Sequence, residues 1–359
     1  MRVGILTFHC AYNYGAMLQC YALQESLAGI GADVSVIDYR PAYLATRPVA
    51  VRVWSLISPL HPQRSFNRMF RQIPSMKRTY ERHKDFEKRY YKLSRTVTAG
   101  DELKELLSSY DVVLVGSDQV WNSRFNGNDG AWYADWDGLS SVRFVSYAAS
   151  AGDPAPADVE RVLSSVGRFE AVSVREESLR EKLDDKAVTV ADPVILASPE
   201  LWDRWTAPLL DGKYVLVYQG RSDDSVLEIA KGIAGKYGAE VVVADNYMNG
   251  FVNGVRHVEV GPDGFVSLVK NAMCVITTSF HGAAVSIVSQ TPFYVVRLDD
   301  GADMRAEELL TRFGLDDRMI AKSSRPDVFE MDFSASVQKI EEQRGLSNEF
   351  LINALELCR

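Results

Sequence analysis

Residues 273–297 read MCVITTSFHGAAVSIVSQTPFYVVR. The apolar run 273–277 predicts a buried strand, residues 283–289 predict a helix, and residues 292–297 predict a further strand. Strand–helix–strand units of this kind build parallel sheets with helices on their faces. The polar segment Thr278-Ser279-Phe280-His281-Gly282 then lies where the first strand ends, and open parallel sheets bind ligands beyond that edge.

The same alternation of strands and helices extends over most of the 359 residues, which is too long for one ordinary domain. We therefore predict an α/β protein of two Rossmann-like lobes with parallel sheets and a cleft between them. The first lobe spans residues 1–200, the second spans 201–334, and a C-terminal helix over 335–359 packs back on the first lobe. The strands expected from apolar runs lie at residues 3–8, 33–38, 111–115, 143–148, 171–174, 188–191, 214–218 and 240–244.

Residues 42–95 interrupt this pattern with prolines, aromatic residues and many cations. From residue 64 to 95 there are 11 Lys and Arg against three acids. We expect one or two inserted helices in the first lobe. Their cations could contact anionic lipid headgroups or a lipid-linked phosphate, although an ordinary solvated helix face explains them equally well.

Composition excludes several classes of protein. Hydrophobic residues make up 47% and charged residues 25%, which are globular values. A net charge of −8 argues against nucleic acid as the main partner. The four cysteines form no CxxC pair and no zinc-type cluster, so we expect reduced thiols and no metal. With no signal peptide or membrane span expected, the predicted location is the cytoplasm, at the inner face of the membrane if the substrate is lipid-linked.

His281 opens a helix directly after a strand, which makes its surroundings a candidate anion site. A helix N-terminus offers free backbone N–H groups and the positive end of a dipole. Gly282 lets the backbone approach a ligand closely, and Ser279 adds a hydroxyl. A phosphate or a carboxylate would fit, but a helix cap or a buried structural histidine would give the same pattern.

Polar clusters follow several strands of the first lobe as well. Asn13 and Gly15 could contact an anion or a sugar hydroxyl, or could simply cap a helix beside packed tyrosines. The segment 116–122 concentrates a carboxylate, an amide and an aromatic ring, as carbohydrate sites often do, and also fits a turn before a helix. Arg175 follows a strand and suits bidentate binding of a carboxylate or phosphate, or an ion pair with a neighbouring acid; Arg305 is equally ambiguous.

Taken in order, these clusters resemble the polysaccharide pyruvyl transferase family. The resemblance extends from residue 1 to about residue 320 and implies a GT-B-like fold of two Rossmann-type lobes. It implies transfer of the pyruvate unit of phosphoenolpyruvate to two hydroxyls of a sugar, with a cyclic ketal and phosphate as products. The matching segments are Asn13-Tyr14-Gly15-Ala16, Val115-Gly116-Ser117-Asp118-Gln119-Val120-Trp121-Asn122, Ser146-Tyr147-Ala148-Ala149-Ser150, Val172-Ser173-Val174-Arg175-Glu176, Asp192-Pro193 and Thr278-Ser279-Phe280-His281-Gly282.

The resemblance also assigns roles. His281 contacts the donor and is our candidate acid, Asp118 is the candidate base toward the acceptor, and Asp192 is the reserve base. Many members carry an arginine two residues before the histidine, where this chain has Ser279, so Arg175 and Arg305 are the candidate cations for the donor. The expected donor contacts are His281, Ser279, Phe280, Gly282, Arg175 and Arg305, and the expected acceptor contacts are Asn13, Tyr14, Gly15, Ser117, Gln119, Trp121 and Tyr147.

This chemistry requires no metal and no cofactor besides phosphoenolpyruvate as co-substrate. The sugar acceptor belongs to a surface polysaccharide or to its lipid-linked precursor.

Two alternative functions remain. One is a GT-B-type glycosyltransferase that uses a nucleotide sugar, for which Asp245-Asn246 and Gly261-Pro262-Asp263 are the candidate pocket segments. The other is a non-catalytic glycan-binding relative with the same fold.

Overall fold

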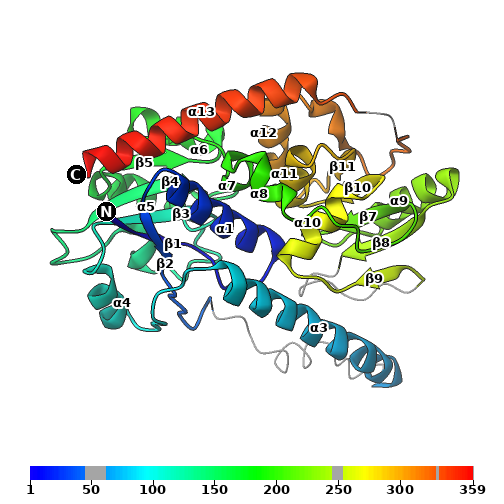
Figure 1. Cartoon of the computed structure of the whole chain (residues 1–359), viewed down its shortest axis with the longest axis horizontal. Coiled ribbons are helices and arrows are strands. Elements are labelled where there is room, and N and C mark those ends of the chain that lie inside the picture. Colours follow the sequence, from blue (N-terminus) through cyan, green and yellow to red (C-terminus); the bar gives the residue numbers. More distant parts are fainter. Residues whose placement is uncertain (45–61, 245–253, 329–330, 359) are drawn as a thin grey trace.

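Two parallel sheets lie side by side, each flanked by helices (Figure 1). The computed structural model describes residues 1–44, 62–244, 254–328 and 331–358, and for residues 62–72 it describes the backbone alone. Each sheet contains six strands within these ranges, and all the strand pairs are parallel. The predicted α/β fold of two Rossmann-like lobes is therefore confirmed.

The sheet of the first lobe has the strand order β2-β1-β3-β4-β5-β6. Its central strand β3 is buried along its whole length, and β4 is buried at every residue except Arg143, because helices cover both faces. The strands are β1 (Arg2–Leu6), β2 (Asp33–Val36), β3 (Val112–Asp118), β4 (Arg143–Ala149), β5 (Ala171–Val174) and β6 (Val188–Thr189). The helices of this part of the chain are α1 (Tyr14–Gly29), α3 (Pro62–Tyr90), α4 (Gly100–Leu107), α5 (Pro156–Ser165), α6 (Glu177–Leu183), α7 (Pro193–Leu196) and α8 (Pro199–Asp203).

The sheet of the second lobe has the order β12-β11-β10-β7-β8-β9. Its strands are β7 (Tyr214–Tyr218), β8 (Glu240–Ala244), β9 (Arg256–Val258), β10 (Cys274–Thr277), β11 (Phe293–Val296) and β12 (Met319–Ile320). Its helices are α9 (Asp224–Tyr237), α10 (Pro262–Lys270), α11 (Phe280–Val288) and α12 (Met304–Phe313), and α13 (Ser334–Leu357) follows them. Helix α11 begins three residues before the predicted helix, because Ser279 caps it, and so His281 lies in its first turn.

Aromatic packing joins the two lobes beside the first turn of α1. The Tyr14 ring stacks on Phe265 of α10 at 4.5 Å between centroids and on His83 of α3 at 5.0 Å. Burial lowers the pKa of His83 to about 4, so this imidazole packs as a neutral ring. Tyr14 is thus a packing residue at the lobe interface.

In the described part of the basic insertion, residues 62–95, one long helix, α3, passes under the molecule from the first lobe to the second (Figure 1). Arg78 pairs with Glu259 of the second lobe at 2.7 Å, and Arg89 lies 4.0 Å from Asp263. Some of its cations therefore connect the lobes.

Among the helices that the structure describes, none combines the length and the apolar composition that a membrane crossing requires.

Helix α13 runs along both lobes and holds α7 in place (Figure 1). The Arg344 guanidinium donates from Nε to the carbonyl of Ile195 at 2.7 Å, and the backbone N–H of Ala191 donates to Ser347 Oγ at 2.8 Å. These hydrogen bonds are buried. Because Ala191 precedes Asp192, α13 fixes the entry of the chain into α7.

Replacing Ser347 with alanine should destabilise the protein by about 1–3 kcal/mol, since the buried N–H of Ala191 loses its acceptor. The measurement is the free energy of unfolding in urea. Asn353→Ala, on the exposed side of the same helix, is the control and should change it by less than about 0.5 kcal/mol. Equal values for the two variants would contradict this role of Ser347.

Candidate active site

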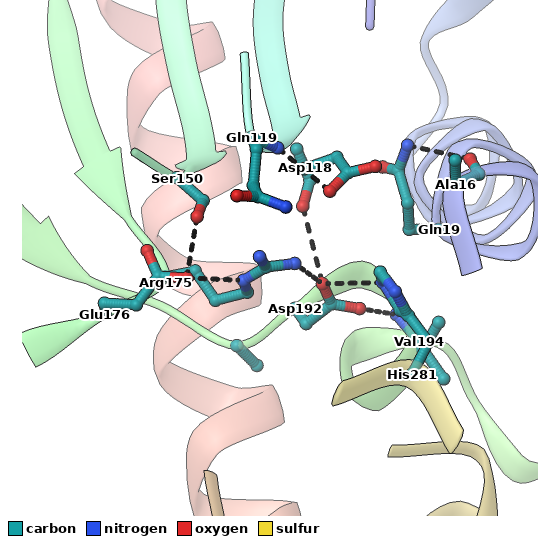
Figure 2. Close-up of polar contacts among 12 residues, drawn as sticks. Ala16, Gln19, Asp118, Gln119, Ser150, Arg175, Glu176, Asp192, Val194 and His281 are labelled. Carbon is teal, nitrogen blue, oxygen red and sulfur yellow. Dashed lines mark hydrogen bonds and ion pairs between the residues drawn. The ribbon is translucent and has the colours of Figure 1, made fainter. Parts of the chain in front are cut away.

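Three side chains from different elements meet between the lobes. Arg175 follows β5, Asp192 is the N-cap of α7, and His281 lies in the first turn of α11. The first two belong to the first lobe and the third belongs to the second. Figure 2 shows Arg175 and His281 approaching the Asp192 carboxylate from opposite sides.

The Asp192 carboxylate is buried and forms the centre of this group. Its Oδ2 accepts from Arg175 Nη1 at 2.8 Å and from Ser117 Oγ at 3.5 Å, and its Oδ1 accepts from the backbone N–H of Val194 at 2.9 Å. Burial alone would raise the pKa of Asp192, but the attraction of His281 and Arg175 outweighs burial and holds this pKa well below its usual range. Asp192 is therefore an anion at neutral pH.

Arg175 is fixed on three sides. Besides Asp192, its Nε donates to Glu176 Oε1 at 3.0 Å, and the guanidinium carbon lies 4.2 Å above the Phe280 ring centroid. Burial alone would lower the pKa of Arg175, yet the charges of Glu176 and Asp192 raise it above its ordinary value. Its remaining nitrogen, Nη2, is buried and has no hydrogen-bond partner among the described residues.

The His281 imidazole is 7% exposed and lies edge-on to the Phe280 ring, with 5.0 Å between centroids. Its Nε2 is 3.6 Å from Asp192 Oδ2, within ion-pair range but slightly beyond hydrogen-bond range, and it has no hydrogen-bond partner among the described residues. Gly15 packs directly against this ring, because a Cβ at position 15 would lie 2.1 Å from His281 Nδ1. The first helix of one lobe therefore fixes the orientation of the histidine of the other.

Ser279 and Gly282 have structural roles next to His281. The Ser279 side chain caps α11 by accepting from the backbone N–H of Gly282 at 3.4 Å. A Cβ at Gly282 would lie 2.3 Å from Thr277 Oγ1, so the glycine is needed for close packing of the helix on the end of β10. These packing contacts are enough to explain why small residues surround His281, so ligand binding is not needed to explain them.

A small cavity of about 10 Å³ lies beside Arg175, and one water-sized molecule would fill it. Three arginines and three carboxylates line it: Arg175, Arg305, Arg312, Glu176, Asp192 and Glu308. Two further buried atoms have no described partner, Arg305 Nε and Glu176 Oε2. Burial and the charge of Arg175 lower the pKa of Arg305. A larger anion can enter only if the lining side chains move apart.

One face of α12 supplies the second-lobe side of this cavity. Glu308 Oε2 accepts from the backbone N–H of Glu177 at 2.8 Å, and Arg312 Nη2 donates to the carbonyl of Arg175 at 2.9 Å. The sequence analysis missed Glu176, Glu308 and Arg312. The positions 305, 308 and 312 follow the i, i+3, i+7 spacing of one helix face. This spacing could have indicated from the sequence that the three side chains lie on the same side of α12.

The loop after β3 also reaches this region. Asp118 has a left-handed backbone with φ of 65°, and its Oδ1 accepts from the backbone N–H of Gln119 at 2.9 Å. Its charge contributes to the raised pKa of Arg175, and Figure 2 shows Asp118 above the Arg175–Asp192 pair. Gln119 Oε1 accepts from Asn122 Nδ2 at 3.0 Å.

Several residues expected to contact a sugar are packed in the core instead. Trp121 is fully buried and donates from Nε1 to the carbonyl of Trp132 at 2.8 Å. Tyr147 is fully buried and its hydroxyl donates to the carbonyl of Ala191 at 2.9 Å. Asn13 caps α1 by accepting from the N–H of Ala16 at 2.8 Å. The rings of Trp121, Tyr147 and Tyr14 are therefore closed to a sugar in this structure.

The remaining expectations concern metals and nucleotide pockets. The described residues contain no group of three or more His, Cys, Asp or Glu side chains arranged to hold a metal ion. Of the two segments considered for a nucleotide, Asp245-Asn246 lies outside the described residues. Gly261-Pro262-Asp263 forms the start of α10 and packs against α3, since a Cβ at Gly261 would lie 3.1 Å from the carbonyl oxygen of Arg82.

Comparison with known proteins gives one family and a common fold. A family model described as polysaccharide pyruvyl transferase matches residues 13–300. No curated protein sequence matches the chain. UDP-GlcNAc 2-epimerase from Neisseria meningitidis, bound to UDP-GlcNAc, is similar in structure, with a TM-score of 0.52, 13% identity and 99% of each chain covered. The likeness concerns the fold alone.

Two further solved structures show weaker likeness. The Methanocaldococcus jannaschii UDP-GlcNAc 2-epimerase in complex with UDP-GlcNAc and UDP has a TM-score of 0.49 at 13% identity, with 99% of each chain covered. The E. coli heptosyltransferase WaaC with ADP has a TM-score of 0.40 at 12% identity, with 97% of this chain and 100% of that chain covered.

Gly15→Ala should lower the free energy of unfolding by about 1–3 kcal/mol, because the new methyl group collides with the His281 ring. Gly29→Ala at the other end of α1 is the matched control, because nothing lies within 4 Å of its Cβ position. Urea unfolding of both variants tests the contact. A Gly15→Ala protein as stable as the Gly29→Ala protein would contradict it.

Proposed function

Because the chain belongs to the polysaccharide pyruvyl transferase family, we propose that it moves the pyruvate unit of phosphoenolpyruvate onto two hydroxyls of a sugar. The acceptor is part of a surface polysaccharide or its lipid-linked precursor. The product is a cyclic ketal, and phosphate is released. The observation that carries this proposal is the meeting of His281 with the Arg175–Asp192 pair at a buried, arginine-lined cavity.

The arginines are suited to an anionic donor. Phosphoenolpyruvate carries a carboxylate and a phosphate, and a guanidinium binds either group in a bidentate manner. Arg175 Nη2 and Arg305 Nε have no described partner, so each can donate to an incoming oxygen without breaking a hydrogen bond seen here. We propose that Arg175 and Arg305 hold the donor and together replace the cation absent at Ser279.

His281 is our candidate for binding the donor phosphate and protonating it as it leaves. The ring lies in the first turn of α11, and its Nε2 is 3.6 Å from Asp192 Oδ2. Asp192, already paired with Arg175, then orients the ring, and Asp118 is the candidate base that accepts a proton from the attacking hydroxyl.

The test is release of phosphate from phosphoenolpyruvate in the presence of galactose-, mannose- and glucose-containing acceptors, followed by the mass of the product. Thermal-shift titration with phosphoenolpyruvate and with a panel of nucleotides separates this function from that of a nucleotide-sugar glycosyltransferase. Stabilisation by a nucleotide alone favours the glycosyltransferase. Absence of phosphate release with every acceptor favours a glycan-binding relative.

His281→Ala should lower kcat for ketal formation by about 10²–10⁴-fold, the usual contribution of a positioned acid or base, while the protein stays folded. His257→Ala is the matched control, since that histidine lies on β9, at the far edge of the same sheet. Steady-state phosphate release measures both variants. Turnover of the His281→Ala protein near that of the control would contradict the assignment.

For a lipid-linked acceptor, we propose that lysines of α3, two of them exposed and Lys84 half-buried, contact anionic headgroups at the inner face of the membrane. Lys77, Lys84 and Lys88 share one side of the helix at spacings of seven and four residues. Replacing all three with alanine should weaken binding to phosphatidylserine vesicles by about 1 kcal/mol per lysine in a sedimentation assay. Alanine at the exposed Lys213, Lys231 and Lys236 of the second lobe removes the same charge and is the control; equal losses would contradict a specific surface.

A further inference from the structure

Glu176 is a buried carboxylate that the roles above leave unused. Its side chain is 2% exposed, and Oε1 accepts from Ser150 Oγ at 2.8 Å and from Arg175 Nε at 3.0 Å. The second oxygen, Oε2, has no described partner although it is buried. Glu176 is one of the residues that line the cavity, and Figure 2 shows its side chain beside Arg175 and Ser150.

The charges of the groups that line the cavity balance one another. Its lining contains three guanidinium groups and three carboxyl groups. The neighbouring titratable and charged groups are Arg175, Arg305, Arg312, Asp192, Glu308, Asp118 and His281. A donor that carries a carboxylate and a phosphate adds several negative charges to this closed space. Because a buried excess of like charge is costly, part of it has to be neutralised by protons taken up with the ligand.

Among the three lining carboxylates, Glu176 is the best placed to accept such a proton. Asp192 already accepts hydrogen bonds on both oxygens, from Arg175 and Val194, and has a lowered pKa. Glu308 accepts from the backbone N–H groups of Glu177 and Ser178. Only Glu176 keeps an oxygen that a proton can occupy without displacing a donor seen in the structure.

We propose that Glu176 is the catalytic residue that takes up a proton when the donor binds and delivers it from Oε2 to the donor methylene carbon. This role rests on the proposed pyruvyl transfer. It divides the acid chemistry between two residues: Glu176 acts on carbon, and His281 acts on the phosphate.

The step is balanced as follows. The proton leaves Oε2, and the carbon–carbon π pair of the enol forms the new C–H bond, which converts the methylene to a methyl group. The central carbon becomes oxocarbenium-like and is attacked by the first sugar hydroxyl. Phosphate then departs with the electrons of its C–O bond, and the second hydroxyl closes the ring. Asp118 accepts the proton of the first hydroxyl and passes it on to restore Glu176, and the proton of the second leaves on phosphate through His281.

The first measurement needs no turnover. Calorimetric titration with phosphoenolpyruvate in buffers of different ionisation enthalpy gives the number of protons taken up on binding. The Glu176→Gln protein should take up about one proton fewer than the wild type. Glu177→Gln is the matched control, because the adjacent carboxylate is half-exposed and lies outside the cavity lining; it should match the wild type.

The second measurement is turnover. Glu176→Gln should lower kcat by about 10²–10⁴-fold and should change the acidic limb of the pH–kcat profile, with donor affinity within a few-fold of the wild type. If that variant does not fold, Glu176→Asp retains the acid with a shorter reach, and we expect wild-type proton uptake with reduced kcat. Wild-type proton uptake by Glu176→Gln, or wild-type kcat in either variant, would overturn the role of Glu176.

Phosphate release by the wild type in the same assay separates the two proposals. Its absence with every acceptor contradicts pyruvyl transfer itself. Its presence, together with a Glu176→Gln protein of unchanged kcat and pH profile, contradicts only the role of Glu176. A variant that loses donor affinity alone would show that Glu176 acts by positioning Arg175, and would also overturn proton delivery.

Discussion

The contact on which the rest of the site depends is the buried Asp192 carboxylate held between Arg175 and His281. A buried charge is tolerated only where other charges and hydrogen bonds replace its hydration. Here the replacements come from both lobes, because Arg175 and the capping N–H of Val194 belong to the first and His281 belongs to the second. The first lobe supplies the hydrogen bonds of the carboxylate, and the second lobe adds the charge attraction of His281 at 3.6 Å. The packing around it follows this need, including the bond from Ala191 to α13 and the fit of Gly15 against the histidine.

Sequence reasoning succeeded where a local pattern determines local structure. Apolar runs gave β5, β7 and β8 at their observed bounds, because a strand covered on both faces has few polar positions. His281 could be placed at the start of a helix after a strand for the same reason. Arg175 and Asp192 each follow a strand of the first sheet. Because parallel strands direct their carboxyl ends to one edge of the sheet, the two residues could be expected at that edge. Whether these residues act on a substrate is a separate question, which the fold leaves open.

What sequence could not supply was the partner of each side chain. Trp121 and Tyr147 look like sugar-stacking rings in a linear motif, but the fold turns both inward and pairs their polar atoms with carbonyls. Glu176 resembles an ordinary acid at the start of a helix, and only the burial of its carboxylate with one oxygen free distinguishes it. The pairing of Arg312 with the carbonyl of Arg175 joins residues 137 positions apart, which no local spacing encodes. These differences all arise from tertiary contacts.

The division of the site between the lobes links binding to chemistry. Arg175, Glu176 and Asp192 come from one lobe, whereas His281, Arg305 and Arg312 come from the other. A cavity with room for about one water molecule cannot admit a donor without some separation of these groups. In the proposed reaction, the negative charges of the donor attract arginines from both sides, and the same attraction brings His281 and Glu176 to the positions from which we propose that they transfer protons. The groups proposed to bind the donor are then also those that bring the two lobes together, so that the proposed acids act on a donor shielded from water.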